Sequence, residues 1–148
     1  MATTIYNAGL RDIIAGAVRL ESDTIVAMLV DENYTNPPIT DEFVADITLQ
    51  GFEAQNAVGT GYQRKVVTGK EFIVDDVTNN TLFTCDELRW TNIQTTDPLK
   101  FVVFYRQGFN DDTSRLLFAY EIPLTVTVGA DLLIRFDDNI AINVTRTP

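Results

Sequence analysis

Short apolar segments separated by turn-forming residues recur along most of this sequence, and this rhythm constrains the fold more than any other feature. Residues 25–30 (IVAMLV) form an uninterrupted apolar run between polar neighbours, which predicts a strand covered on both faces. Two further apolar runs have the same character: residues 101–105 and 116–120. Shorter segments with partial two-residue alternation predict further strands at residues 62–67, 71–77, 82–85 and 88–93.

The last third of the chain continues this pattern. Pro123 interrupts an apolar segment and predicts an edge or a bulge there, because proline cannot donate to a strand ladder. Alternation at residues 132–136 and 140–144 predicts strands with one solvent-facing side. Turn-forming residues predict hairpin tips at residues 77–80, 108–112, 129–131 and 137–139.

Strands and turns in this succession, without helical crossovers, predict an all-β fold: an antiparallel β-sandwich or jelly roll. Two short helical segments are expected beside the strands. In residues 10–18 the apolar positions Leu10, Ile13, Ile14, Ala17 and Val18 fall on one face of a helix. Gly9 and Gly16 weaken this prediction, and the stretch could instead enter a strand. Residues 41–47 predict one acidic-capped turn with Phe43, Val44 and Ile47 inward. The chain has no linker or repeat, so residues 1–148 are expected to form one domain.

Composition narrows the classes of partner. The chain has 21 acidic and 11 basic residues and a net charge of −10, which disfavours nucleic acid and anionic membranes as partners. No apolar run is long enough to span a bilayer, and no signal peptide is evident. Cys85 is the only cysteine, so an internal disulfide is impossible. We therefore expect synthesis in a cytoplasm.

The residues that most enzymes rely on are missing or isolated. The chain contains no histidine, which removes the commonest general base and metal ligand. Cys85 has no base beside it in the sequence and is expected to be a buried thiol. We therefore expect no catalysis, no cofactor and no metal centre. A glycan hydrolase that uses paired carboxylates remains the alternative, with acidic pairs at residues 75–76, 111–112 and 137–138. Calcium binding by one of these oxygen-rich loops also stays open.

Two longer loops and several aromatic residues are candidates for protein contacts. Residues 31–40 include a stiff stretch with Pro37 and Pro38, and residues 49–60 are rich in polar and small residues. Trp90 is expected to be buried. The expected interface residues lie in or near loops: Tyr34, Pro37, Pro38, Tyr62 and Phe109.

An ordered series of short motifs resembles a known family. The motifs run in this order: Tyr6-Asn7-x-Gly9-Leu10, Asp23-Thr24-Ile25, Met28-Leu29-Val30-Asp31, Tyr34, Glu42-Phe43-Val44, Gly59-Thr60-Gly61-Tyr62-x-Arg64-Lys65 and the strand around Trp90. Together they resemble a family of small virion structural proteins of tailed bacteriophages, over the first two-thirds of the chain. The resemblance leads us to expect histidine where Asp41 stands and proline where Arg115 stands.

The resemblance implies a virion component without enzymatic activity, made in the host cytoplasm. The resemblance does not choose the position on the particle. Together with the stiff loop at Pro37 and Pro38 and the aromatic Tyr34 and Tyr62, it leads us to expect a capsid decoration (cement) protein on the capsid surface, which binds the major capsid protein. Because threefold axes of the shell repeat one contact three times, we expect a symmetric homo-oligomer, with a trimer favoured. A tail or head–tail connector protein is the alternative within the same class.

Overall fold

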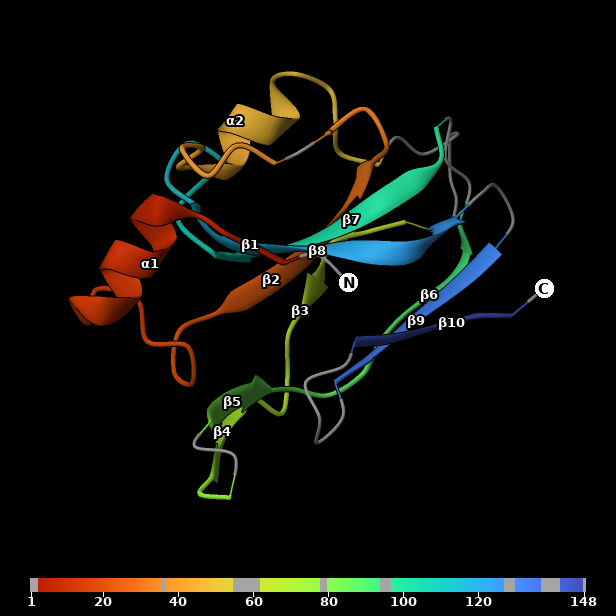
Figure 1. Cartoon of the computed structure of the whole chain (residues 1–148). Coiled ribbons are helices and arrows are strands. Elements are labelled where there is room, and N and C mark those ends of the chain that lie inside the picture. Colours follow the sequence, from red (N-terminus) through yellow and green to blue (C-terminus); the bar gives the residue numbers. More distant parts are fainter. Residues whose placement is uncertain are drawn as a thin grey trace.

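The computed structural model describes residues 3–35, 37–54, 62–77, 80–93, 97–126, 130–136 and 142–147 (Figure 1). Within this part the fold is all-β with two short helices, as the sequence predicts. All strand pairs are antiparallel. The largest sheet has five strands in the order β1 (Thr3–Ile5), β8 (Arg115–Val126), β7 (Leu99–Arg106), β2 (Ile25–Asp31) and β3 (Lys65–Val66).

Two smaller sheets and two helices complete the described structure. The three-stranded sheet has the order β10 (Ile142–Thr147), β9 (Ala130–Phe136) and β6 (Leu88–Ile93), and β4 (Glu71–Asp75) pairs with β5 (Asn80–Thr84). The helices are α1 (Asn7–Ile14) and α2 (Val44–Thr48). No helix in the described part of the chain has the length and apolar character needed to cross a membrane.

The five-stranded sheet is covered on both faces, and β2 shows why. Every residue of β2 is buried, and alternate side chains enter two different cores. Ile25, Ala27 and Leu29 pack with Trp90 of β6 and other residues of the three-stranded sheet. Val26, Met28 and Val30 pack on the opposite face with residues from α2 and from the segments around Tyr6 and Tyr34. Two antiparallel sheets thus pack face to face as a sandwich, and α2 with its preceding loop adds a further layer (Figure 1).

Helix α1 differs from the prediction in position and in the face that it buries. It begins at Asn7 and ends at Ile14, and Leu10 and Ile14 are 42% and 78% exposed. The buried side carries the small residues Ala8 and Gly9 instead. A Cβ atom on Gly9 would lie 2.2 Å from the backbone oxygen of Leu116, so glycine permits the close approach of α1 to β8. Of the five residues on the predicted face, Val18 is buried and Ile13 packs against the core, whereas Leu10, Ile14 and Ala17 are exposed.

Helix α2 agrees better with the sequence. Val44 and Ile47 are fully buried, and the Asp46 carboxylate accepts hydrogen bonds from the backbone N–H groups of Glu42 and Phe43 at 2.8 and 2.9 Å. Phe43 is only half-buried. The predicted acidic cap is therefore present, and it lies at the third residue of the helix.

Several strand boundaries also differ from the prediction. Only two of residues 62–67 form a strand, β3, and Leu133 on the predicted wet face of β9 is buried. Leu99 pairs with Val126 and Phe101 pairs with Glu121, so β8 bulges around Pro123 as predicted. The described residues do not include 78–79, 129 and 137–139 of the predicted tips, nor residues 140–141 of the predicted strand.

Trp90 is an anchor of the core between the two sheets. Its side chain is 1% exposed, and its indole N–H donates a 2.8 Å hydrogen bond to the backbone oxygen of Gln63. Cys85 is also buried, and burial together with the nearby Asp86 charge raises the pKa of its thiol to about 12. Both residues are buried as the sequence predicts.

We expect Trp90→Ala to lower the free energy of unfolding by about 3–5 kcal/mol, because it removes a large buried side chain and its hydrogen bond. Arg89→Ala is the matched control, because Arg89 is exposed on the same strand. Denaturant unfolding of both variants measures the difference. A cost below about 1 kcal/mol for Trp90→Ala would contradict its role in the core.

Candidate functional site

The turn between β7 and β8 carries the most exposed large apolar side chain in the described structure. Arg106 and Arg115 form the last strand pair, and residues 107–114, here called the Phe109 hairpin, connect them. Phe109 is 96% exposed. An aromatic ring left in water costs free energy unless a partner covers it, so this residue is the first candidate for a contact.

Internal hydrogen bonds fix the conformation of the Phe109 hairpin. The Thr113 hydroxyl accepts from the backbone N–H groups of Phe109 and Asn110 at 2.9 and 3.1 Å. The Ser114 hydroxyl accepts from the N–H of Gly108 at 3.0 Å and donates to the backbone oxygen of Asn110 at 2.8 Å. Because the backbone is already ordered, a partner that binds Phe109 would not have to order this loop.

Helix α2 holds the hairpin from one side. The backbone N–H of Val44 donates to Ser114 O at 2.9 Å, and that of Ala45 donates to Asp111 O at 3.1 Å. These N–H groups lie in the first turn of the helix, where no intrahelical acceptor exists. The start of α2 and the hairpin therefore satisfy each other's backbone groups.

Arg64 holds the hairpin through side-chain ion pairs. Its guanidinium donates to both carboxylate oxygens of Glu53 at 2.7 Å, and to both oxygens of Asp111 at 2.8 and 3.1 Å. It also donates to the Tyr105 hydroxyl at 3.2 Å. These hydrogen bonds hold the pKa of Asp111 below its usual value. We call Arg64, Glu53 and Asp111 the arginine clamp.

Tyr62, which the sequence presented as an interface residue, supports this clamp. Its hydroxyl donates to Glu53 at 2.8 Å and accepts from the N–H of Leu29 at 3.2 Å. Burial and the Glu53 charge raise the pKa of this hydroxyl. Tyr62 therefore connects the clamp to the central strand β2.

Two other predicted interface residues are buried, which corrects the expectation for the loop of residues 31–40. Tyr34 is 2% exposed: its ring packs near Phe52 and Phe101, and its hydroxyl donates to Asp41 at 2.9 Å. The Tyr6 hydroxyl lies 2.9 Å from the Tyr34 hydroxyl and can donate to it. Pro37 is buried as well, whereas Pro38 is exposed. Tyr34 points inward because it fills part of the core on the second face of the five-stranded sheet, while residues 32, 33, 35 and 38–40 of the loop are exposed.

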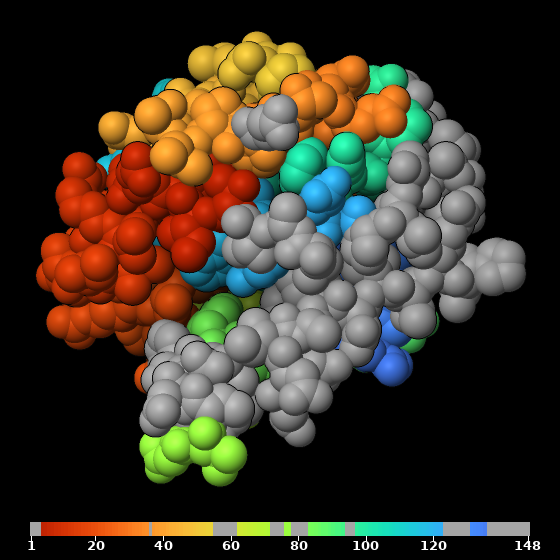
Figure 2. All heavy atoms as spheres, in the orientation of Figure 1, coloured from red at the N-terminus to blue at the C-terminus, as the bar shows by residue number. Residues whose placement is uncertain are grey.

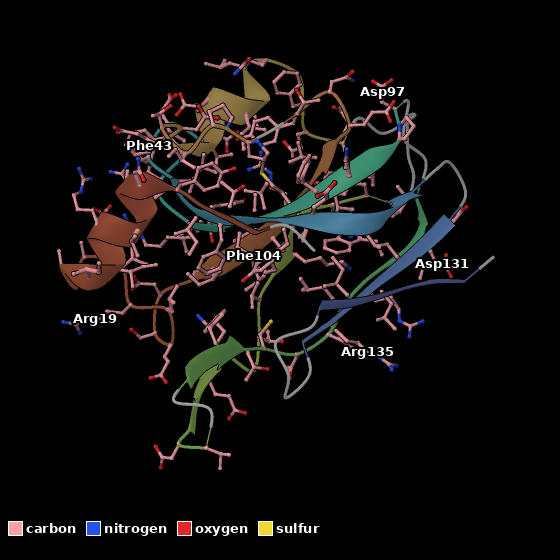
Figure 3. All side chains as sticks on the ribbon, viewed as in Figure 1. Arg19, Phe43, Asp97, Phe104, Asp131 and Arg135 are labelled. Carbon is pink, nitrogen blue, oxygen red and sulfur yellow. The ribbon has the colours of Figure 1, made fainter. Side chains whose placement is uncertain are left out.

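Arg115 joins the two helical segments beside the hairpin. Its guanidinium stacks on the Phe43 ring at 4.3 Å from the centroid, and it forms ion pairs with Asp12 at 2.8 Å and Glu42 at 3.4 Å. Asp12 belongs to α1, and Phe43 precedes α2. Thus α1, α2 and the hairpin meet at one end of the molecule (Figures 1 and 3).

The acidic residues are not arranged as a metal centre in the part that the structure describes. Within the described residues, no group of three or more carboxylate or cysteine side chains could hold a metal ion. In the predicted acidic pair at 111–112, the Asp111 carboxylate forms an ion pair with Arg64, while Asp112 is exposed. The side chain of Asp75 and the pair at 137–138 lie outside the described residues.

We expect Arg64→Lys to lower the free energy of unfolding by about 2 kcal/mol, because an ammonium group cannot bind two carboxylates in a bidentate manner. Arg11→Lys serves as the control: Arg11 pairs with Asp12 alone and is 64% exposed, so its replacement should change stability by less than about 0.5 kcal/mol. Equal effects of the two substitutions in urea unfolding would contradict the clamp.

The clamp also predicts a pH dependence. Because folding lowers the pKa of Asp111, this residue stabilises the folded state above its unfolded pKa of about 3.9, and the contribution is lost as the pH falls below it. The difference in free energy of unfolding between the wild type and Asp111→Asn should therefore shrink as the pH is lowered from about 6 to about 3, an interval that spans this titration. A difference that stays constant with pH would count against the ion pair.

Comparison with family models, with curated proteins and with solved structures finds no match for this chain. The candidate site consequently rests on its own geometry: an exposed aromatic ring on a hairpin that α2 and the arginine clamp hold in place.

Proposed function

We propose that this protein is a structural component of a bacteriophage virion, and specifically a capsid decoration protein that binds the major capsid protein and stabilises the head. The assignment to a virion rests on the resemblance described for the sequence. The binding role is supported by one observation above the others, which is the 96% exposure of Phe109 on a hydrogen-bonded hairpin.

An exposed ring of this kind suits a contact between proteins. Aromatic residues dominate binding energy at protein interfaces when they enter a pocket of the partner. The hairpin loses little conformational entropy on binding, because Thr113 and Ser114 already fix its backbone. Many such contacts on one shell would add to the cohesion of the capsid even if each were weak.

The acidic surface supports the same role. A net charge of −10 keeps free subunits soluble before they bind. Asp112 is exposed three residues after Phe109, so we expect basic residues around the pocket that receives the ring.

Electron cryomicroscopy of the assembled particle tests the proposed position. A decoration protein should give many copies on the shell, with the Phe109 hairpin against a capsid subunit. A single ring of copies on the tail or at the head–tail junction would overturn this proposal in favour of a tail or connector protein. A carbohydrate-cleaving activity that survives purification would overturn the non-enzymatic role.

Phe109→Ala should raise the Kd for the particle by about 30-fold or more, the effect typical of a central aromatic contact. The variant should unfold like the wild type, because the ring contributes almost nothing to the core. Val77→Ala is the matched control: Val77 is 93% exposed but lies in the turn that follows β4, away from the Phe109 hairpin in the sequence. Copy number per particle at limiting protein concentration gives the measurement. An equal drop in copy number for Phe109→Ala and Val77→Ala would contradict a specific contact at Phe109.

A further inference from the structure

The end of α1 presents a second apolar surface, which the proposed function has not used. Leu10 and Ile14 are 42% and 78% exposed, and Ala15 and Ala17 follow them on the surface. Two exposed arginines, Arg11 and Arg19, accompany these residues. We call these six residues the α1 patch; they belong to the red to orange-red segment at the left of Figure 2, and Figure 3 labels Arg19.

The six residues of the α1 patch include two arginines and no acidic residue, with Asp12 and Asp23 beside them: Asp12 pairs with Arg11, and Asp23 accepts a hydrogen bond from the backbone N–H of Arg19. The chain has 21 acidic and only 11 basic residues, yet two arginines lie beside this apolar surface. Arg11 pairs with Asp12, but its side chain remains 64% exposed. The Phe109 hairpin combines the complementary features, namely a protruding ring and the exposed carboxylate of Asp112. A ring with an acidic rim fits an apolar surface with a basic rim.

The two surfaces lie on the same side of the molecule. Gly9 of α1 lies against Leu116, and Asp12 pairs with Arg115, the residue at which the hairpin joins β8. Helix α1 therefore begins beside the start of β8, and its last turn extends away from the hairpin on the same side of the molecule (Figure 1). Two copies that face each other with these sides can use both surfaces twice.

We propose that the Phe109 hairpin of one copy docks on the α1 patch of a second copy, and that the reverse contact forms about the same twofold axis. Phe109 covers Leu10 and Ile14 of the second copy, while Asp112 approaches Arg11 and Arg19. This contact makes a dimer, in place of the trimer expected from the resemblance. It deepens the proposed function by naming a partner for Phe109 in the free protein, and it rests on that function only for the role of the hairpin as a binding element.

Sedimentation equilibrium of the purified full chain tests the contact. The wild type should form a dimer, and both Phe109→Ala and Ile14→Asp should raise the dimer Kd by about 30-fold or more. Both side chains are exposed, so neither change should alter the unfolding transition. Val77→Asp places a charge on an equally exposed residue in the turn that follows β4 and should leave the dimer intact.

Mixing the two defective variants distinguishes this pairing from general stickiness. Phe109→Ala retains an intact α1 patch, and Ile14→Asp retains an intact hairpin, so an equimolar mixture should restore one of the two contacts and form heterodimers. A mixture that remains as dissociated as each variant alone would overturn the pairing, as would a wild type that stays monomeric or forms a trimer unaffected by either substitution.

Failure of the self-contact and failure of the decoration role would give different results. A monomeric protein that still decorates particles would overturn the self-contact and leave the decoration role standing. A dimer with the predicted variant effects but no copy on the particle would support the self-contact and overturn the decoration role.

Discussion

The pairing of β2 with β7 and β3 determines how the rest of the chain must fold. Each residue of β2 is buried, and its side chains alternate between two cores, so both faces of the five-stranded sheet need a cover. The three-stranded sheet covers one face, with Trp90 at the centre of the contact. Helix α2 and the loop that follows β2 cover the other. The inward path of Tyr34 is a direct consequence, because this residue fills part of that second core.

Covering the second face brings polar groups into the interior, and their pairing shapes the candidate site. Tyr34 carries its hydroxyl inward and satisfies it with Asp41. Glu53 and Asp111 approach each other at the rim of the sheet, where Arg64 neutralises both. The Arg64 guanidinium, which pairs with both carboxylates, thus also fixes the Phe109 hairpin. Stability and the presentation of the exposed ring depend on the same contacts.

The sequence predicted what depends on local pattern. Apolar runs identified β2, β7 and most of β8, Pro123 indicated the bulge, and Trp90 was correctly expected to be buried. Contacts between distant segments left no comparable signal. Nothing near Arg64 in the sequence indicates its pairing with Asp111. Periodicity grouped Leu10 and Ile14 with Val18 on one helical face, and it could not reveal that α1 packs through Gly9, because that close approach depends on the position of β8. Among the expected interface residues, Phe109 and Pro38 are exposed because they lie beyond the covered sheet, whereas Tyr34, Pro37 and Tyr62 support it.

The central claim is that the Phe109 hairpin is the element through which this protein binds within an assembly. Amide hydrogen exchange, measured on the free protein at low concentration and on the protein bound to assembled particles, tests it most directly. The account predicts that binding slows exchange in residues 107–114, while exchange in β6 stays unchanged because that strand is already part of the core. Particle-bound protein in which residues 107–114 exchange as fast as in the free chain would contradict the account.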